Sequence, residues 1–358
     1  MTNQTVLIAM SGGVDSSVAA FLLRRAGLDC HGITMRLFDP ASFAIVGENR
    51  PTCGTAAEAE DAEKIAKSLG IPFDVMDFSA EFQRNVIDYF IQTYLDGGTP
   101  NPCVQCNRTM KFGKLFEAGR RLGCERIATG HYARIQKIGD RYCLLRAKDL
   151  SKDQSYVLWQ LTQELLAATI FPLGELSKDE VRAIALENGF CNATRRDSQD
   201  ICFVPDGDYV AFIERNTRVT FPKGAFLDLQ GNRLGEHNGL IRYTVGQRKG
   251  LGLAFGKPTY VCKKDPATNT VILGSNDDLF SRELTAHSVN LIAVDRIDTP
   301  IRVQAKVRYT AKPAAATAVQ DEVGNLHLVF DEAQRALSPG QSVVLYDGDL
   351  VIGGGIIA

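Results

Sequence analysis

A short loop rich in glycine and serine is the segment of this chain whose residues point most directly to chemistry. Residues 10–17 read MSGGVDSS and lie between an apolar run, residues 5–9, and a stretch with helical periodicity. Gly12 and Gly13 let the backbone approach an anion closely, and the amides after them lie where a helix start leaves N–H groups unpaired. The segment therefore predicts a phosphate-binding loop. It is neither the GxxxxGK[ST] loop, because no lysine follows the glycines, nor the GxGxxG loop.

The same loop carries a carboxylate, Asp15, where a phosphate site is expected to hold only cations. A carboxylate beside polyphosphate is typical of sites with a bridging Mg²⁺, so Asp15 is interpreted as a ligand of that metal or of its water. The alternative without chemistry is a helix N-cap after a glycine-rich turn. The position between a strand and a helix favours the phosphate site.

Two cysteines stand at the start of a basic segment further along the chain. Cys103 and Cys106 form a CxxC motif, and Arg108, Lys111 and Lys114 follow at helical spacing. A cysteine near a helix N-terminus among cations is expected to have a lowered thiol pKa and more thiolate. Cys106 is therefore a candidate nucleophile.

A lone CxxC leaves structural zinc, a redox pair and two unrelated thiols open. Zinc normally takes four ligands, and the sequence offers no second CxxC or HxxxH. A third thiol, Cys202, stands in a charged context, RRDSQDICF at residues 195–203. The other cysteines are interpreted as small buried hydrophobes; they are Cys30, Cys53, Cys124, Cys143, Cys191 and Cys262.

The elements that must position these residues alternate between strand and helix in the first half of the chain. Such alternation predicts a doubly wound α/β fold: a parallel sheet with helices on both faces and a ligand site at the C-terminal ends of the strands. A capping box at Ser177 and Glu180 predicts one further helix start. The strands are expected at residues 5–9, 31–37, 73–77 and 126–129, and the helices at 18–26, 56–69, 81–95 and 177–188.

After residue 207 the sequence pattern changes to short segments in which apolar and polar residues alternate, separated by Gly and Pro. This pattern predicts two small all-β barrels. The expected domains are a catalytic α/β domain that carries the phosphate loop at residues 1–207, a central β-rich domain at 208–280 and a C-terminal β-barrel at 281–358. The β segments are expected at residues 225–229, 242–245, 259–263, 271–273, 285–291, 301–309, 314–319, 326–330, 342–346 and 350–357.

Composition and charge narrow the class of protein. The 358 residues are 45% hydrophobic and 23% charged, which excludes a disordered chain. No apolar run is long enough to span a membrane and no export signal is evident, so a cytosolic protein with free thiols is expected. The net charge of −2 hides a net −7 over residues 39–100 and a net +8 over residues 101–152. This separation of charge has two interpretations. One is a pair of ordinary solvated faces, and the other is a basic surface that binds phosphates.

Several motifs together resemble one known family. SGGVDSS alone resembles the pyrophosphatase-type loop of ATP-dependent adenylating enzymes. The ordered set resembles the bacterial tRNA-specific 2-thiouridylase (MnmA) family, with a weaker continuation at KVRYTAKP, residues 306–313. The set comprises SGGVDSS (11–17), TPNPCVQCN (99–107), ATGHYAR (128–134), KDQSYVLW (152–159), DSQDICF (197–203) and TVGQRKGLG (244–252).

The resemblance implies a reaction on tRNA. In that family ATP adenylates the C2 oxygen of the wobble uridine in the anticodon loop and pyrophosphate leaves. Sulfur then arrives as a persulfide on the residue matching Cys202 and displaces AMP, while the residue matching Cys106 forms a disulfide with Cys202 or helps release hydrosulfide. The implied partners are tRNA and a sulfur-donor protein, a cysteine desulfurase or a relay protein; the implied cofactors are ATP and Mg²⁺, and a monomer is expected.

The resemblance also assigns binding residues. The predicted ATP contacts are Ala9, Met10, Ser11, Gly12, Gly13, Val14, Asp15, Ser16, Ser17, Met35 and Gly130. The predicted tRNA contacts are Asn101, Pro102, Cys103, Lys152, Asp153, Gln154, Arg308 and Tyr309. His131 is interpreted as a structural histidine, and TVGQRKGLG as a loop that contacts phosphate.

One position departs from the family pattern, and other functions compete. Some family members carry Asp where Cys103 stands, so the role of that Asp is not carried over. Cys103 could be inert, tune Cys106, or join Cys106 and Cys202 on an iron–sulfur cluster, although a persulfide relay is preferred. The competing functions are an adenylating synthetase for a small metabolite and a metal-sensing or RNA-binding module.

Overall fold

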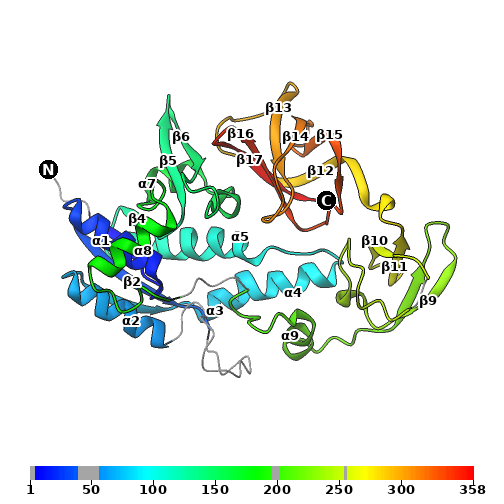
Figure 1. Cartoon of the computed structure of the whole chain (residues 1–358), viewed down its shortest axis with the longest axis horizontal. Coiled ribbons are helices and arrows are strands. Elements are labelled where there is room, and N and C mark those ends of the chain that lie inside the picture. The colour runs from blue at the N-terminus through cyan, green and yellow to red at the C-terminus, as the bar shows by residue number, and fades with distance from the viewer. Residues whose placement is uncertain (1–4, 39–55, 196–200, 254–255) are drawn as a thin grey trace. The chain divides into compact units, whose positions relative to one another are not determined.

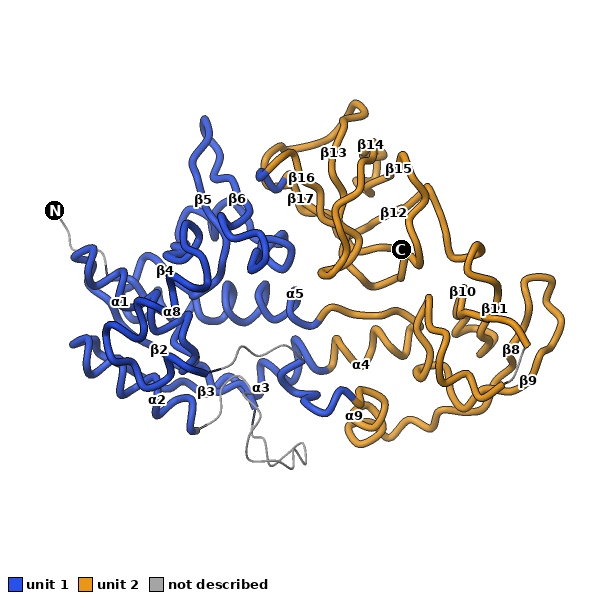
Figure 2. The backbone as a smooth tube through the Cα atoms, viewed as in Figure 1, with its two compact units in different colours: residues 1–87, 102–207, 349–351 blue, residues 88–101, 208–348, 352–358 orange. Residues whose placement is uncertain are grey.

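The computed structural model describes residues 5–38, 56–195, 201–253 and 256–358. The chain forms two compact units, drawn in different colours in Figure 2. Unit 1 comprises residues 1–87, 102–207 and 349–351, and unit 2 comprises residues 88–101, 208–348 and 352–358. Cys53 and the first four residues of DSQDICF lie outside the described residues. The division into three domains stays a prediction.

The centre of unit 1 is a parallel sheet of five strands in the order β3-β2-β1-β4-β7. The order is the doubly wound arrangement that the alternation of strands and helices predicts, and Figure 1 shows the helices around it. The strands are β1 (Val6–Ala9), β2 (Cys30–Arg36), β3 (Phe73–Asp77), β4 (Arg126–Ala128) and β7 (Thr169–Ile170).

The central strand β1 is apolar because both of its faces are covered by helices. Val6 and Ile8 are fully buried in a cluster with residues of α1, α2 and α8. Leu7, which points to the opposite face, packs near Gly119 of α6. A strand buried on both faces reads as a continuous apolar run, which is why the sequence predicts it well.

The helices of unit 1 fall close to their predicted positions. The predicted helix at 81–95 begins earlier, at Ser79, and passes through a π-helical segment. The helices are α1 (Val14–Arg25), α2 (Ala56–Ser68), α3 (Ser79–Phe82), η2 (Gln83–Ile87), α5 (Pro102–Cys106), η3 (Asn107–Lys114), α6 (Leu115–Arg121), the 3-10 helix η4 (Ser155–Leu158), α7 (Gln163–Ala168) and α8 (Lys178–Glu187), with α4 (Asp88–Leu95) continuing η2 in unit 2.

A hairpin interrupts the α/β alternation of unit 1, and the sequence pattern does not predict it. Strands β5 (Ala133–Ile138) and β6 (Arg141–Arg146) pair antiparallel across a turn at Gly139, which adopts a positive φ of 59°. The outer half of β5 is exposed. A strand with little burial carries a weak hydrophobic pattern, which explains why it is hard to detect.

Unit 2 contains a four-stranded sheet in the order β10-β11-β8-β9. The strands are β8 (Gly224–Leu227), β9 (Arg233–His237), β10 (Tyr260–Asp265) and β11 (Thr270–Gly274), preceded by helix α9 (Tyr209–Asn216). The predicted strand at 242–245 is wrong: the 3-10 helix η5 (Leu240–Arg242) ends at the first of these residues, and the other three form no strand. Leu240 and Tyr243 are buried in the core of this sheet, so their apolar character reflects burial rather than strand structure.

Six further antiparallel strands of unit 2 close into a barrel. Their order is β12-β15-β14-β13-β16-β17, and a β12–β17 pairing closes the ring. The interior is an apolar cluster that includes Leu284, Phe330 and Leu345. The strands are β12 (Phe280–Leu291), β13 (Ile301–Lys306), β14 (Ala314–Gln320), β15 (Leu326–Arg335), β16 (Ser342–Asp347) and β17 (Leu350–Ile357), the last beginning in unit 1, where Leu350 pairs with Leu145 of β6.

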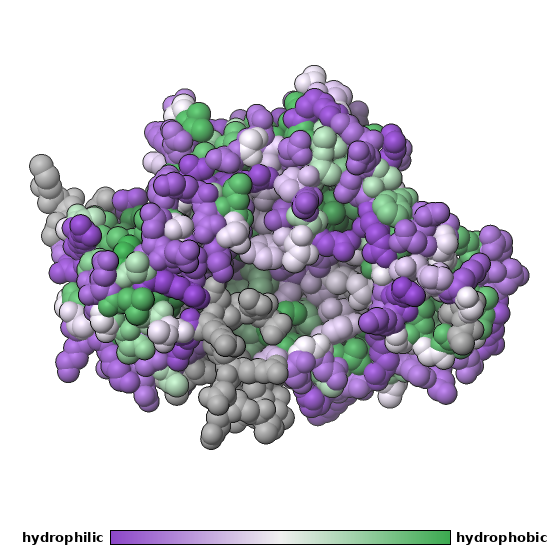
Figure 3. All heavy atoms as spheres, in the orientation of Figure 1, coloured by the Kyte–Doolittle hydropathy of each residue, from purple (hydrophilic) through white to green (hydrophobic). Residues whose placement is uncertain are grey.

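The surface is that of an ordinary globular protein. The face seen in Figure 3 is dominated by hydrophilic side chains, with hydrophobic ones scattered among them. Among the described residues, no helix has the length and apolar character needed to cross a membrane.

Candidate functional site

The predicted phosphate loop joins the end of β1 to the start of α1. Gly13 is the N-cap of α1, so Val14, Asp15 and Ser16 supply the first N–H groups of the helix. Gly12 has a positive φ of 72°, and a Cβ at this position would lie 2.3 Å from the carbonyl oxygen of Glu58. The loop therefore needs glycine here for its conformation and for the close approach of α2.

The serines of the loop close it upon itself. The hydroxyls of Ser16 and Ser17 each donate to the carbonyl of Gly13 at 3.0 Å. The backbone N–H of Ser11 donates to Ser16 Oγ at 3.2 Å. Ser16 and Ser17 are buried whereas Ser11 is exposed. Ser16 and Ser17, two of the predicted ATP contacts, thus serve the shape of the loop, and the hydroxyl of the exposed Ser11 lies 3.4 Å from Ser16 Oγ.

Asp15 is engaged within unit 1. The ammonium of Lys178 lies 2.7 and 2.9 Å from the two oxygens of this carboxylate, and the hydroxyl of Tyr132 donates to Oδ1 at 2.8 Å. Among the described residues, no group of three or more His, Cys, Asp and Glu side chains is placed to hold a metal ion. Asp15 is thus held by two partners, and its role as a ligand of Mg²⁺ or of the water on it stays a prediction.

Two side chains from the end of unit 1 hold the other side of the loop. Asn192 donates to the carbonyl of Gly12 at 2.7 Å and to Ser17 Oγ at 2.9 Å. Arg195 donates to the same Gly12 carbonyl at 3.1 Å and pairs with Asp61 on α2, also at 3.1 Å. Both contacts leave the N–H groups of the loop available.

Sequence reasoning missed Lys178, Tyr132 and Asn192 as neighbours of the loop. Arg195 stands in the charged RRDSQDICF motif, so a signal for it existed. Tyr132 belongs to the ATGHYAR motif, which marks the segment but not the contact. Lys178 and Asn192 have no chemical signature in the sequence, because only the fold brings them to a loop more than 160 residues earlier.

The remaining predicted ATP contacts lie beside the loop. Ala9 ends β1, while Met10 and Met35 are buried at the ends of β1 and β2. Because both methionine side chains are covered, any contact they make with a ligand falls to the backbone. A Cβ on Gly130 would lie 2.8 Å from Ser16 N, so Gly130 allows its segment to approach the first turn of α1.

Cys106 and Cys103 lie on one continuous helical segment. Pro102 starts it, a position at which proline is favoured, and the π-helical stretch η3 follows Cys106 directly. Burial raises the pKa of the Cys103 thiol, and Lys111 offsets part of the increase. Part of the surface of Cys103 is nevertheless exposed to water. Reagents in solution can therefore reach this residue. Cys106 is half-buried.

Cys202 is also half-buried, and only Ile201 separates it from residues 196–200, which lie outside the described residues. The next residue, Phe203, is buried and packs edge-on against Phe82 of α3 with ring centroids 5.8 Å apart. The aromatic contact anchors this end of the segment to unit 1. Among the described residues, Cys103, Cys106 and Cys202 are not gathered into a metal-ligand group, and an iron–sulfur cluster on them stays a prediction.

Residues of the KDQSYVLW motif have internal partners. Asp153 accepts from the N–H of Ala147 at 3.0 Å and from Ser155 Oγ at 2.8 Å. Gln154 accepts from the N–H of Tyr132 at 2.9 Å. These contacts tie the motif to the segment that supports the phosphate loop. Contacts of Lys152, Asp153 and Gln154 with tRNA stay predictions.

Histidine 131 fits the structural interpretation. His131 is buried, and its Nδ1 lies 2.7 Å from the hydroxyl of Thr129. Burial holds the pKa of His131 well below its usual value, with a smaller contribution from the Lys111 charge. The ring is therefore neutral at physiological pH and packs as an aromatic beside Phe112 and Phe171.

In unit 2, the predicted tRNA contacts differ in exposure. Tyr309 is exposed, and the ammonium of Lys306 lies over its ring at 5.3 Å from the centroid. Arg308 donates to the carbonyls of Arg335 and Ala336 at 2.8 and 2.9 Å, which fixes its guanidinium on the barrel.

The segment before α5 is held within unit 2. Gln341 donates to the carbonyl of Thr99 at 2.8 Å, and the N–H of Thr99 donates to the carbonyl of Pro339 at 2.7 Å. Lys264 of β10 donates to the carbonyl of Gly98 at 3.3 Å. Asn101, a predicted tRNA contact, follows these anchored residues, so both β regions of unit 2 fix the chain that enters the helix of Cys106.

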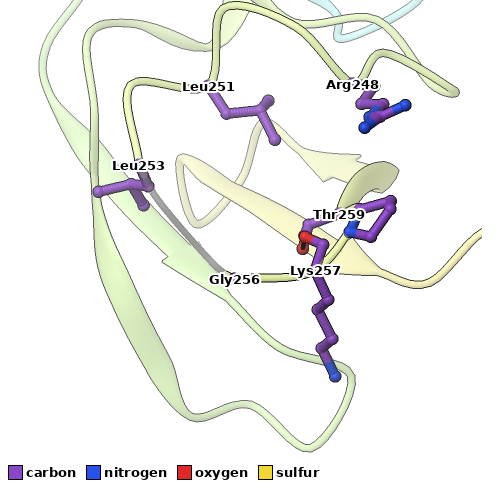
Figure 4. Close-up of a pocket in the computed structure, with 7 residues that line it drawn as sticks. Arg248, Leu251, Leu253, Gly256, Lys257 and Thr259 are labelled. Atoms are coloured by element: carbon purple, nitrogen blue, oxygen red, sulfur yellow. Dashed lines mark hydrogen bonds between the residues drawn. The ribbon is translucent and has the colours of Figure 1, made fainter.

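The TVGQRKGLG motif borders a pocket of about 330 Å³ in unit 2. In Figure 4, Leu251 and Leu253 lie on one side of this pocket and Arg248 on the other, while Lys257 extends away from Arg248. The lining therefore combines an apolar wall with cations. Its role in contacting phosphate stays a prediction.

Known proteins similar to this chain cover all of its parts. The family model described as "tRNA methyl transferase HUP domain" matches residues 4–206, "tRNA methyl transferase PRC-barrel domain" matches 211–275, and "Aminomethyltransferase beta-barrel domain" matches 281–357. The chain resembles the structure of NMN synthetase from Francisella tularensis only distantly, with 14% identity, a TM-score of 0.35, and coverage of 61% of this chain and 79% of that one.

Curated relatives match at much higher identity. The tRNA-specific 2-thiouridylase MnmA of Clostridioides difficile is 49% identical over 99% of this chain and 98% of its own length. The protein of the same name from Clostridium kluyveri is 47% identical, with coverage of 98% of both chains. The chain therefore belongs to the tRNA-specific 2-thiouridylase family.

Proposed function

We propose that this chain is an ATP-dependent sulfurtransferase that converts the wobble uridine of tRNA to 2-thiouridine. The observation that carries the proposal is the presence, in unit 1, of a helix start that follows two glycines, together with the two cysteines expected for sulfur transfer. The match to relatives named tRNA-specific 2-thiouridylase over nearly their whole length supports the same reaction.

The first step is activation of the base. The C2 oxygen of uridine attacks the α-phosphorus of ATP, an O-adenylate forms, and pyrophosphate leaves. The N–H groups of Val14, Asp15 and Ser16 and the hydroxyl of Ser11 face the region where the phosphates bind, so they stabilise negative charge that develops on phosphate oxygens. Mg²⁺ accompanies the triphosphate of ATP in this proposal, and Asp15 is the predicted ligand of the metal or of the water on it.

The second step is sulfur transfer. The terminal sulfur of a persulfide on Cys202 attacks C2 of the activated uridine, and AMP leaves with the bonding electrons of the C2–O bond. The Cys106 thiolate then attacks Sγ of Cys202, which breaks the bond to the transferred sulfur and leaves 2-thiouridine and a Cys106–Cys202 disulfide. An external dithiol returns both cysteines to thiols. No step requires an iron–sulfur cluster.

Recognition of tRNA is assigned to the predicted contacts in both units. The target base lies in an anticodon loop, so it must be extruded to reach the reacting groups. Arg108 and Lys111 on the segment after Cys106, and the exposed Tyr309 on the barrel, have the chemistry to contact phosphates and bases. Binding should therefore weaken steeply with salt.

We further propose a cytosolic monomer of three domains, residues 1–207, 208–280 and 281–358, that receives sulfur from a donor protein. The eight cysteines that the structure describes are free thiols, which suits a reducing compartment. Light scattering of the full chain tests the monomer, and transfer of labelled sulfur from a cysteine desulfurase to Cys202 tests the donor.

The test is a reconstituted reaction. The protein, ATP, Mg²⁺, a persulfide donor, a reductant and unmodified tRNA are incubated, and nucleosides are analysed by mass spectrometry. We expect 2-thiouridine, and its mass separates sulfur-for-oxygen exchange from methylation. No product under conditions in which a related thiouridylase works would overturn the proposal. The same assay separates this reaction from that of a small-metabolite synthetase. Such an enzyme should release pyrophosphate without tRNA and keep its turnover in a Cys106→Ala variant.

A further inference from the structure

A nearly buried lysine lies beside the phosphate loop. Lys178 is the first residue of α8, and its side chain keeps only 8% of its surface exposed. Its ammonium contacts both oxygens of Asp15, at 2.7 and 2.9 Å, and the hydroxyl of Tyr132 donates to the same carboxylate at 2.8 Å. The loop itself contains no lysine. The fold thus brings to the loop the cation that its sequence lacks.

The start of α8 does not depend on this charge. Ser177 and Glu180 form a complete capping box, and the backbone N–H of Lys178 donates to Asp149 at 3.1 Å. A buried ion pair is poor evidence of a contribution to stability, because desolvation offsets much of the attraction between its charges. The ammonium is therefore better explained by what it does to Asp15.

Asp15 lies in the first turn of α1, next to the N–H groups that face the phosphates. An uncompensated carboxylate there would repel the triphosphate, because two negatively charged groups would meet at contact distance. Lys178 brings the local charge to zero. Tyr132, itself only 2% exposed, gives the carboxylate a second fixed partner.

We propose that Lys178 is a positioning residue of the phosphate loop. It neutralises Asp15 and holds the carboxylate against Tyr132, so that the N–H groups of the α1 N-terminus remain open to the triphosphate of ATP. This inference rests on the proposed function for the identity of the nucleotide. It assigns to α8 a part in nucleotide binding that neither the motifs nor their spacing indicates.

A double-mutant cycle tests this charge balance. The affinity of the full chain for Mg²⁺·ATP is measured by titration calorimetry in wild type, Lys178→Met, Asp15→Asn and the double variant. We expect Lys178→Met to weaken ATP binding by about 10- to 100-fold in the wild-type background. In the Asp15→Asn background the same change should cost less than about threefold, because no carboxylate is left to neutralise.

Matched variants separate charge from shape. Lys178→Arg, which keeps the charge, should stay within about fivefold of wild type. Lys67→Met removes an exposed lysine on α2 and should leave ATP affinity unchanged. Binding of tRNA, measured on the same samples, should not change in the Lys178 variants. If Lys178→Met does not fold, Lys178→Gln replaces it in the cycle.

Two outcomes would overturn the inference. One is an equal cost of Lys178→Met in both backgrounds, which would make its role purely structural. The other is unchanged ATP affinity in Lys178→Met. Failure of the proposed function looks different, because then the wild-type chain itself binds ATP but forms no 2-thiouridine, or does not bind ATP at all.

Discussion

The phosphate loop and the cysteine segments of unit 1 are built in different ways. Four side chains from distant segments hold the loop, with Asn192 and Arg195 on the Gly12 carbonyl and Lys178 and Tyr132 on Asp15. Cys106 and Cys202, by contrast, lie half-buried at the end of α5 and beside an anchoring phenylalanine, and the described structure does not gather them around a metal.

This difference indicates which part of unit 1 serves adenylation and which part serves sulfur transfer in the proposed reaction. A loop fixed from several sides offers its N–H groups to phosphate without rearrangement, which is the condition for electrostatic stabilisation. In the proposed mechanism, Cys202 and Cys106 act one after the other on a sulfur atom that a donor protein supplies. We therefore expect changes near the loop to alter ATP affinity, and changes at the cysteines to stop sulfur transfer while adenylation continues.

The largest expected effect tests this separation directly. Cys106→Ser and Cys202→Ser should each lower 2-thiouridine formation by about 1,000-fold or more, because each residue is used at a different point of one transfer sequence. Pyrophosphate release that depends on tRNA should persist in the first turnover. The interpretation of Cys191 as a buried residue is wrong, because the structure exposes it, and Cys191→Ser in the same unit should match wild type in both assays. Equal loss of pyrophosphate release would contradict the separation.

The second prediction concerns the geometry of the loop. Gly12→Ala places a Cβ 2.3 Å from the carbonyl oxygen of Glu58 at a φ of 72°, so the loop must shift. We expect the KM for ATP to rise by about 100-fold, since an ångström of misplacement can cost that much. KM is measured by pyrophosphate release.

Gly27→Ala is the matched control for this change. Gly27 has a similar φ of 77°, but a Cβ there meets no atom within 4 Å. It should lower the free energy of unfolding by about 1–2 kcal/mol through backbone strain alone and leave the KM for ATP unchanged. Equal KM values for the two variants would show that the approach of α2 to the loop is unimportant.

The elements of the fold also differ in how well the sequence predicts them. The buried strand β1 and the glycines of the loop have strong local signatures, since burial on both faces and a positive φ each restrict residue type. The β5–β6 hairpin has no such signature, because its exposed residues tolerate many side chains. The strand expected at 242–245 failed because burial, rather than strand pairing, selects Tyr243.

For the candidate site, local motifs locate the reacting segments but not their supports. MSGGVDSS identifies the loop by its own residues. Lys178 and Asn192 act through contacts that depend on the packing of α8 and of the turn after it, and a lysine after a capping serine is also common on ordinary surfaces. The folded structure is needed to see that one of these residues carries a buried charge.

The third prediction concerns the chain that leads into the cysteine helix. Burial lowers the pKa of Lys264 to about 8, and its ammonium donates to the carbonyl of Gly98. Below pH 8 the lysine is charged in both states and burial costs about 3 kcal/mol; between pH 8 and its ordinary value of 10.5, only the unfolded state binds the proton. The free energy of unfolding should therefore rise with pH over this window.

Lys264→Met should remove this rise, as measured by urea unfolding from pH 7 to pH 10.5. Lys263→Met, at the exposed neighbour on β10, should keep the wild-type slope. If Lys264→Met also lowers sulfur transfer without changing ATP affinity, the Gly98 contact positions the segment before Cys106. A wild-type slope in Lys264→Met would show that the ammonium is hydrated.

The smallest expected effect comes from a comparison of the N-caps of two helices, α8 and α7. Helix α8 carries Lys178, which contacts Asp15 of the phosphate loop. Ser177→Ala and Thr162→Ala each remove a side chain that accepts a hydrogen bond from the first turn, of α8 and α7 respectively. Each should lower the free energy of unfolding by about 1 kcal/mol. Only Ser177→Ala should also raise the KM for ATP, by about two- to threefold, because a frayed α8 start loosens Lys178 on Asp15. Equal KM values in the two variants would mean that the loop keeps its charge balance without a rigid α8, and that Tyr132 alone holds the carboxylate.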